Sequence, residues 1–564
     1  MSIQRKTEHS QQKIYTMSNR YYWLNEDSRT FLSRDYLLPG VTPEQRVRDI
    51  ADYSEKILGI EGFADKFEDY TSRGWFSLST PVWCNFGLDR GYGISCFGLS
   101  IEDDMGDILR ANAEMGMLSK VGGGTAAYFG KLRSRGSEIK NNGKSSGAVS
   151  SMEVFQSTIN YSSQGSTRRG SFAAYLPIDH DDYYEFMDCR SEGSKIQDIS
   201  MAVTISESFM DRLINRDKDA EDRIVKLYQK RFETGYPYVL FDRNVDEGKP
   251  QVYKDKGLSI LTSQLCSEIL EYTDSTKSFT CCLSSMNLLH YDEWKDTDAV
   301  KVLTYFLDSV LTDFINKADG KPFLEKVVLF AKEHRSIGLG VLGYHSMLQS
   351  KMIPFESISA RALNKMIFKN INDKSLEASK ELAKMFGEPK MLEGYGERFT
   401  TRLAVAPTTS SSFILGQISP SIEPLNSNYF LKDLAKGKFS YRNPFLKTLL
   451  ESKGKDNERT WKSILTHGGS VQHLDYLDET EKAVFKTFGE ISQLEVVVQA
   501  ADRQKFIDQA QSLNIMIHPK TPLHEVHALF LEAYRLGVKT LYYQRSANLA
   551  QEVGRDLMNC VMCE

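Results

Sequence analysis

Cysteine is scarce in this sequence of 564 residues, and long apolar runs are missing. Its 8 cysteines are too few for the disulfide framework of a small secreted domain. A zinc ribbon needs two Cys-x-x-Cys pairs, and the chain has only the pair at residues 560–563. No stretch approaches the roughly 20 consecutive apolar residues of a membrane span, and the polar start of the chain carries no signal peptide. We therefore expect a cytoplasmic globular protein with no membrane partner and no metal site of its own.

A strong excess of charge of one sign is also absent. The chain has 70 basic and 75 acidic side chains, which gives a formal net charge of −5. A nucleic-acid partner is not expected, because surfaces that bind nucleic acid are strongly basic. Any phosphate ligand must therefore be held by local groups, such as hydroxyls and the free N–H groups of a helix N-terminus.

Short apolar runs alternate with amphipathic segments, which predicts an α/β fold with a largely parallel sheet. Residues 1–76 are expected to be helical, with one helix opening at Thr42-Pro43, and residues 77–548 to form the catalytic domain. We expect a peripheral insertion at 430–500 and a flexible tail at 549–564. The predicted strands are 95–101, 173–176, 200–205 and 538–543, and the predicted helices are 206–233, 258–272 and 521–536.

An amide, a thiol and a carboxylate alternate at Gln264, Cys266 and Glu268. In an extended segment these three side chains share one face. A thiol can become a thiyl radical that takes hydrogen from carbon, and a neighbouring carboxylate can take a proton from a hydroxyl. The local pattern by itself favours a helix with Cys266 in its buried stripe, so the two interpretations stay open at this point.

Cysteines elsewhere in the chain are candidates for a reducing dithiol. If the runs around Cys96 and Cys281 are neighbouring strands, their thiols can lie within disulfide range and deliver two electrons. The pair Cys560 and Cys563 at the chain end can then reduce that disulfide by thiol–disulfide exchange. Each of these cysteines can also be an inert core residue, although a chain end seldom builds a core.

Two further motifs indicate chemistry. The adjacent phenols Tyr542 and Tyr543 suit the relay of an electron and a proton over distance. A run of hydroxyls follows a proline at a predicted strand-to-helix turn, where it can hold an anion without lysine. A solvated helix cap is the simpler explanation of this run. Its members are Pro407, Thr408, Thr409, Ser410 and Ser411.

Taken in order, these motifs resemble the large, catalytic subunit of class I ribonucleotide reductase from about residue 77 onward. The motifs are Ser79-Thr80-Pro81, Ser95-Cys96, 122–124, 164–170, Leu265-Cys266-x-Glu268, Cys281-x-Leu283-Ser284, 407–411, Leu541-Tyr542-Tyr543 and Cys560 with Cys563. One of them is weak evidence, but nine in the expected order are hard to obtain by chance. The resemblance implies a ten-stranded α/β barrel whose central finger loop carries the radical cysteine.

The resemblance also implies a role for each matching residue. Cys266 would be the thiyl radical that takes the 3′ hydrogen of the ribose, and Glu268 would accept the 3′-hydroxyl proton. Cys96 and Cys281 would supply two electrons and become a disulfide. The substrate-binding residues would be Thr80, Ser95, Gly124, Pro407, Thr408, Thr409, Ser410 and Ser411.

Partners follow from the same resemblance. Tyr542 and Tyr543 would carry the radical in from a separate small subunit, which would hold the metal-radical cofactor. Cys560 and Cys563 would pass the oxidation to thioredoxin or glutaredoxin. A homodimer is expected, with a deoxynucleotide or ATP effector and Mg²⁺ bound at its interface. The effector residues would be Asp103, Asp104, Met105, Arg133, Lys140, Gln164 and Arg168.

The sequence departs from the family pattern at two positions. Gln264 stands where the family usually has asparagine, so the reach of its amide must be set again by the backbone. Cys281 is followed by Cys282, and the spacing to Leu283 favours Cys281 as the redox partner, while a shift of one residue in a strand would favour Cys282. We also expect this chain to lack the N-terminal nucleotide-binding cone through which many relatives sense dATP.

Two other readings stay open. A cobalamin-dependent reductase would run the same chemistry but would have no use for Tyr542 and Tyr543. A nucleotide-binding regulatory protein, with a metal held by the tail cysteines, would not need Cys266.

Overall fold

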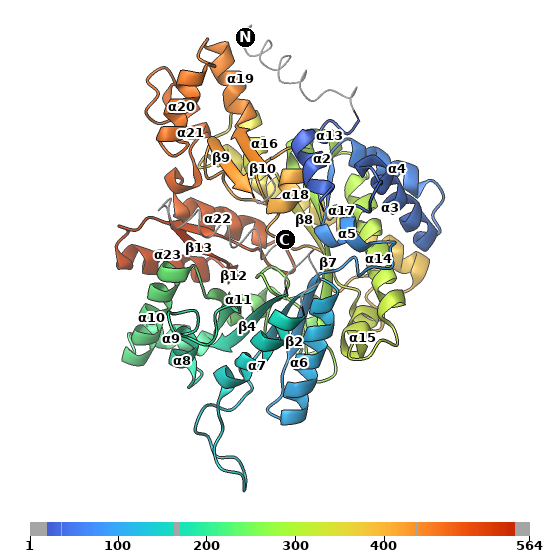
Figure 1. Cartoon of the computed structure of the whole chain (residues 1–564), viewed down its shortest axis with the longest axis vertical. Helices are drawn as coiled ribbons and strands as arrows, with labels where there is room; N and C mark the ends of the chain where they lie inside the picture. Colours follow the sequence, from blue (N-terminus) through green and yellow to red (C-terminus); the bar gives the residue numbers. More distant parts are fainter. Residues whose placement is uncertain (1–19, 35, 163–169, 435–436, 547–564) are drawn as a thin grey trace.

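A curled mixed sheet lies at the centre of the computed structural model, with helices around it (Figure 1). The structure describes residues 20–34, 36–162, 170–434 and 437–546. The strand order is β1-β7-β2-β3-β4-β5-β6-β12, and β8 also pairs with β7. The strands are β1 Phe76–Leu78, β2 Cys96–Ser100, β3 Gly124–Tyr128, β4 Ser171–Pro177, β5 Ser200–Ile205, β6 Tyr238–Phe241, β7 Phe279–Asn287, β8 Ile337–Leu342 and β12 Thr540–Leu541.

The first half of the sheet consists of β2 to β6, which run parallel. Parallel neighbours need a crossover, and helices provide each one. These helices are α6 Met105–Lys120, α7 Ala148–Tyr161, α8 Tyr183–Met187, α9 Glu207–Ile214 and α10 Lys218–Thr234. The predicted βα alternation is therefore confirmed. The predicted helix 206–233 is two helices, because Asp217 caps the start of α10 by accepting a hydrogen bond from Ala220 N at 3.0 Å.

The second half of the sheet runs in the opposite direction. Strand β7 is antiparallel to β2 and parallel to β8. Backbone hydrogen bonds continue from Leu339 N to Arg402 O at 2.8 Å, from Val405 N to Ala510 O at 3.0 Å and from Tyr542 N to Leu513 O at 2.8 Å. Strand β12 then pairs antiparallel with β6. The sheet thus curls back toward its first half.

Residues 258–272 form an irregular loop, so the predicted helix there is wrong. The loop backbone is held by groups from distant strands instead of by its own turns. The Tyr175 hydroxyl donates to Gln264 O at 3.0 Å and to Cys266 O at 2.7 Å, and Ala510 N donates to Glu268 O at 2.8 Å. Because buried backbone groups need partners, these contacts replace the hydrogen bonds that a helix would have made.

Helices of the N-terminal region pack beside the sheet. They are α2 Glu26–Leu32, α3 Pro43–Leu58 and α4 Phe63–Ser72, and α3 and α4 pack on α14 Ala299–Ala318 (Figure 1). The predicted opening of α3 is confirmed. Thr42 Oγ1 accepts a hydrogen bond from Gln45 N at 3.2 Å, and Pro43 occupies the first helical turn.

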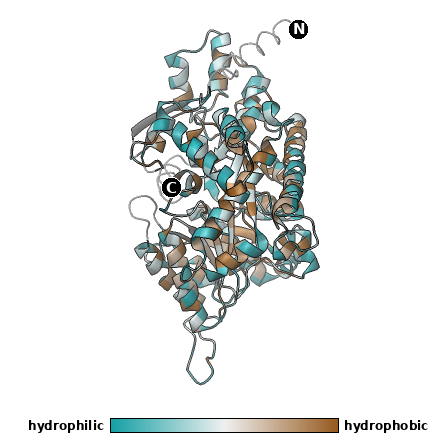
Figure 2. Ribbon diagram, turned by 90° about the vertical axis from the view of Figure 1, so that its right-hand side faces the viewer, coloured by the Kyte–Doolittle hydropathy of each residue, from teal (hydrophilic) through white to brown (hydrophobic). Residues whose placement is uncertain are grey.

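The segment from 429 to 485 has a small core of its own around Leu446, Leu450 and Trp461. It comprises β9 Tyr429–Leu434, β10 Gly437–Arg442, α19 Pro444–Ser452, α20 Glu458–Thr466 and α21 Glu479–Val484. The next helix, α22 Gln493–Gln504, buries Val497 and Ala500 in the main core instead. Apolar residues gather along the inner strands and the inward faces of the helices (Figure 2).

The remaining helices and strands connect or cover these parts. They are α5 Thr80–Asn85, α11 Asp242–Glu247, α12 Gln251–Asp255, α13 Tyr291–Trp294, α15 Glu325–His334, α16 Tyr344–Ser350, α17 Ile358–Phe386, α18 Thr409–Ile414, α23 Leu523–Arg535, β11 Ile515–Ile517 and β13 Gln544–Ser546. Within the part of the chain that the structure describes, no helix has both the length and the apolar composition to cross a membrane.

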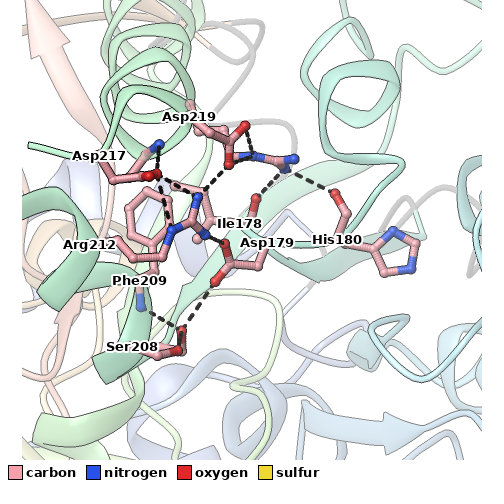
Figure 3. Close-up of polar contacts among 11 residues, drawn as sticks. Ile178, Asp179, His180, Ser208, Phe209, Arg212, Asp217 and Asp219 are labelled. Atoms are coloured by element: carbon pink, nitrogen blue, oxygen red, sulfur yellow. Dashed lines mark hydrogen bonds and ion pairs between the residues drawn. The ribbon is translucent and has the colours of Figure 1, made fainter.

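An ion-pair cluster joins α9 and α10 to the end of β4 (Figure 3). The Arg212 guanidinium contacts Asp179 at 2.8 Å, Asp217 at 2.8 Å and Asp219 at 2.6 Å. These side chains are partly exposed, and each such pair contributes at most about 1 kcal/mol. We therefore assign the cluster to the anchoring of the α9–α10 connection and not to chemistry.

Candidate active site

Cys266 lies in the irregular loop at 258–272, and its side chain is half-buried. The Tyr542 hydroxyl donates to Cys266 Sγ at 3.3 Å. Tyr542 directly follows β12, so the sheet itself sets the position of the phenol. A direct hydrogen bond between a phenol and a thiol is a suitable path for the transfer of a hydrogen atom.

Glu268 is buried beside this thiol, with 1% of its surface exposed. Burial raises the pKa of its carboxyl group, and hydrogen bonds from the Ser512 hydroxyl, the Gln264 amide and Ser267 N oppose that shift. A carboxyl group whose pKa lies above its usual value holds a proton more readily, so it can both accept a proton and return it.

Gln264 places its amide near the same carboxyl group. Its Oε1 accepts hydrogen bonds from the Ser263 hydroxyl at 2.7 Å and from Ile269 N at 3.1 Å. Its Nε2 is buried and meets no described residue in good hydrogen-bond geometry, but the amide still acts on Glu268 and lowers the pKa of that carboxyl group. The amide is therefore placed to orient the carboxylate, and its N–H group can also donate to a ligand oxygen. The hydrogen bond from Ile269 N thus fixes the position of the glutamine side chain, which is one methylene longer than that of asparagine.

Cys96 and Cys281 stand directly opposite each other on β2 and β7. Both are buried, and neither is in a disulfide. Burial raises the pKa of Cys281, which keeps it a thiol. Cys282 lies on the other face of β7, where its Sγ donates to Leu307 O of α14 at 3.4 Å. The geometry therefore favours Cys281 over Cys282 as the partner of Cys96.

The loop lies against the strands that carry these two thiols. Ile269 belongs to a small apolar cluster with Cys96 and Cys281. Leu265 contacts Gly124, which pairs with Cys96 in the sheet. A Cβ on Gly124 would come within 2.9 Å of Leu265 Cδ2, so glycine permits this close approach. The loop that carries Cys266 therefore packs directly against the strands that carry the buried pair.

Two residues that the sequence did not point to hold this site together. Gln509 Nε2 donates to Cys281 Sγ at 3.8 Å and to Ile337 O at 2.9 Å, and its Oε1 accepts from Leu270 N at 3.2 Å. Ser512, on the same segment, donates to Glu268. The polar residues Gln509, Gln511, Ser512 and Asn514 were the available signal, but polar residues at such spacing are also typical of a solvated turn.

Tyrosines gather around Tyr542, the phenol that bonds to Cys266. The ring centroids of Tyr542 and Tyr543 are 4.3 Å apart, and those of Tyr238 and Tyr542 are 4.5 Å apart. The Tyr236 and Tyr543 hydroxyls are 3.0 Å apart. The predicted phenol pair is thus part of a group of four, of which Tyr236 and Tyr238 were not found from the sequence. This group is called the tyrosine cluster below.

The predicted substrate-binding residues lie at the ends of neighbouring elements. Ser95 and Gly124 lie where β2 and β3 begin, and Gly124 N donates to Ser95 O at 2.6 Å. Thr80 begins α5, and its hydroxyl is 3.2 Å from that of Tyr36. The predicted helix start is confirmed, with Thr409, Ser410 and Ser411 in the first turn of α18, while the segment before Pro407 has isolated β-bridges at Leu403 and Val405 in place of a full strand. Just before that turn, Val405 O accepts from Ser512 N at 2.9 Å, so the hydroxyl run follows a segment that contacts the partner of Glu268.

The predicted effector residues that the structure describes surround the start of α6. Arg133 Nε contacts Asp103 Oδ2 at 2.7 Å, and Asp104 caps α6 by accepting from Gly106 N at 2.9 Å. Met105 is 68% exposed, and Lys140 lies in an exposed hairpin near Arg133. Four predicted site residues lie outside the described residues: Gln164, Arg168, Cys560 and Cys563.

Comparisons with known proteins agree on one family. The family model for the ribonucleotide reductase barrel domain matches residues 94–222, 214–395 and 389–544. The ribonucleoside-diphosphate reductase large subunit of Invertebrate iridescent virus 3 is 35% identical, over 90% of this chain and 91% of that protein. The solved structure of the Actinobacillus ureae class Id ribonucleotide reductase alpha subunit is 50% identical, with a TM-score of 0.90 over 96% of this chain and 100% of that one.

Proposed function

The chain belongs to the ribonucleotide reductase family as a large subunit, and we propose that it reduces ribonucleoside diphosphates to 2′-deoxyribonucleoside diphosphates by thiyl-radical chemistry. The observation that carries this proposal is the 3.3 Å hydrogen bond from Tyr542 to Cys266, beside a buried carboxylate and a pair of opposed thiols. We also infer that segments 401–405 and 509–513 complete a ten-stranded barrel, with loop 258–272 as its central finger. The backbone bonds that run from β8 to β12 support this inference.

Radical transfer would use the phenols and the thiol in sequence. A radical on Tyr542, received through Tyr543 from a separate small subunit, takes the hydrogen atom of the Cys266 S–H. The resulting thiyl radical takes hydrogen from C3′ of the bound ribose. The sulfur returns that hydrogen to C3′ at the end of the cycle and is again a thiyl radical. The Tyr542 hydroxyl then gives its hydrogen atom back to the sulfur, which restores the Cys266 thiol and returns the radical to the phenol.

Reduction would use the carboxylate and the opposed thiols. Glu268 takes the 3′-hydroxyl proton, and the amide N–H of Gln264 donates to a ribose oxygen. The 2′-hydroxyl leaves as water with a proton from one of the two thiols. Cys96 and Cys281 together give up two electrons and their hydrogens and become a disulfide, which balances the loss of oxygen from C2′.

Substrate and effector would be held by the residues that the family resemblance names. Thr80, Ser95, Gly124 and the hydroxyl run at 407–411 would hold the sugar and the diphosphate. Asp103, Asp104, Met105, Arg133 and Lys140, with Gln164 and Arg168, would bind a nucleotide effector with Mg²⁺ at the interface of a homodimer. The high exposure of Met105 supports the placement of an interface at the start of α6.

The tail thiols would restore the opposed pair by exchange with its disulfide, and thioredoxin or glutaredoxin would then reduce the tail.

We predict that replacing both Cys560 and Cys563 with serine stops multiple turnover with thioredoxin. The pre-reduced variant should still give a single turnover, because Cys96 and Cys281 already hold two electrons. Rapid-quench measurement of deoxynucleotide per chain tests this. Full multiple turnover with thioredoxin would remove the tail from the mechanism.

Ser512 lowers the pKa of Glu268, the general base of the proposed mechanism. Its hydroxyl stabilises the ionised form of Glu268 and lowers that pKa, so Ser512→Ala should raise the pKa further. The acidic limb of the profile of kcat/KM against pH then moves to higher pH, and the rate at neutral pH falls about 10-fold, as expected for a lost hydrogen bond to a charged group. Ser309→Ala, at a buried hydroxyl of α14 that bonds to Phe306 O, is the matched control. An unmoved acidic limb in Ser512→Ala contradicts this role.

The proposed function is tested by assaying CDP reduction with the small subunit, a dithiol and each effector nucleotide in turn. We expect deoxycytidine diphosphate only when the small subunit is present. Turnover with adenosylcobalamin in place of that subunit would support the cobalamin-dependent alternative. Nucleotide binding without any reduction would support a regulatory protein.

A further inference from the structure

Tyr236 is a buried phenol in direct contact with the radical path. It follows α10 and precedes β6, and 4% of its surface is exposed. Its hydroxyl is 3.0 Å from that of Tyr543, and the two rings meet edge to face with centroids 5.1 Å apart. Tyr543 therefore lies between two phenols, because Tyr542 packs against it from the side of Cys266.

The surroundings of Tyr236 favour loss of its electron together with its proton. The Arg190 guanidinium lies 4.7 Å from the centre of the Tyr236 ring, so a positive charge left on that ring would be repelled. Oxidation must therefore release the phenolic proton at the same time. The Tyr543 oxygen, at hydrogen-bond distance, can take that proton.

We propose that Tyr236 is a third redox-active phenol of this large subunit, which exchanges a hydrogen atom with Tyr543. The inference rests on the proposed function, since the radical must first reach Tyr543. In the exchange, the O–H bond of Tyr236 breaks and an O–H bond forms on Tyr543, while the unpaired electron moves to the oxygen of Tyr236. No other oxidant is required, and the reverse step returns the radical to the path.

This exchange would let the radical rest on Tyr236, which lies off the path from Tyr543 through Tyr542 to Cys266. Both partners are phenols, so the O–H bond that breaks and the O–H bond that forms are of the same kind. The surroundings of the two rings therefore decide how the radical is divided between them. Tyr238 packs within 5.2 Å of Tyr236, 5.0 Å of Tyr543 and 4.5 Å of Tyr542, measured between ring centroids, and fixes the spacing of the cluster. A radical shared with Tyr236 would spend less time on Tyr542 when no substrate is bound.

Incorporation of 3-aminotyrosine, which is oxidised more easily than tyrosine, tests the proposal. The label is placed at 236, at 543 or at 183, and each chain is mixed with small subunit, CDP and effector and frozen for EPR. Tyr183 is a buried control outside the cluster, with its hydroxyl on Arg223 O at 2.9 Å. We expect an aminotyrosyl radical at 543 and at 236 and none at 183.

A radical at 543 without one at 236 would overturn the proposal and leave the proposed function intact. Absence of a radical at 543 as well would instead count against the proposed function. CDP affinity of each labelled chain shows whether the fold tolerates the label. As a second measurement, the chain labelled at 543 is compared with the same chain carrying Tyr236→Phe. If the hyperfine coupling between the radical at 543 and an exchangeable proton is lost in the Tyr236→Phe chain, the result supports the contact. An unchanged hyperfine coupling contradicts it.

Discussion

Cys266→Ser is expected to lower CDP reduction by more than about a thousand-fold, which corresponds to more than about 4 kcal/mol in the activation barrier. The reason is chemical, because a serine O–H holds its hydrogen more strongly than a thiol does and cannot yield it to a phenoxyl radical. The loop should keep its shape, since Tyr175 and Ala510 hold it through backbone oxygens that the substitution leaves in place. CDP affinity should therefore change by no more than a few-fold.

Cys282→Ser is the matched control for this change. Cys282 is as buried as Cys281, but its Sγ faces Leu307 O of α14, and a serine hydroxyl can make the same contact. Activity should survive in Cys282→Ser and be lost in Cys281→Ser, as measured by formation of deoxycytidine diphosphate. Reductase activity in Cys266→Ser would remove that sulfur from the chemistry, and inactivity of Cys282→Ser alone would exchange the roles of the neighbouring cysteines.

Tyr542→Phe should abolish turnover while leaving CDP binding almost unchanged. Phenylalanine keeps the ring contacts with Tyr238 and Tyr543, whose centroids lie 4.5 and 4.3 Å away, so packing should be preserved. Only the hydroxyl that donates to Cys266 Sγ is lost, and phenylalanine cannot form a neutral phenoxyl radical. The measurements are CDP reduction with the small subunit and CDP affinity by calorimetry.

Tyr183→Phe controls for the loss of a buried hydroxyl elsewhere, since Tyr183 bonds to Arg223 O and lies outside the tyrosine cluster. It should keep most of the activity. Near-normal turnover in Tyr542→Phe would mean that the radical reaches Cys266 by another route, and weakened CDP binding would indicate a structural role for this hydroxyl.

Strands and helices that depend on local sequence pattern could be predicted from the sequence. Parallel strands buried on both faces appear as short apolar runs, so the predicted strands at 173–176 and 200–205 correspond to β4 and β5. The pairing of Cys96 with Cys281 followed from the assumption of neighbouring strands, and the register confirms that these residues stand opposite each other. Alternation along β7 then explains why Cys282 faces away.

Features that depend on contacts between distant segments could not be predicted. The loop at 258–272 has a pattern that also fits a helix, and what keeps it irregular is the Tyr175 hydroxyl and the backbone of Ala510. Gln509 and Ser512 resemble residues of a solvated turn until the sheet curls and buries them beside Cys281 and Glu268. Tyr236 is distant in sequence from Tyr543, and only the fold brings their hydroxyls together.

The central claim is that the sulfur of Cys266 takes hydrogen from C3′ of a ribose. A competition between CDP and [3′-²H]CDP, with the complete enzyme and one effector, measures that step directly. The claim predicts that the deuterated substrate is consumed more slowly and that its product retains the deuterium at C3′, with no such discrimination for [5′-²H]CDP. Equal consumption of the two 3′ isotopologues, together with loss of the deuterium from the product, would contradict it.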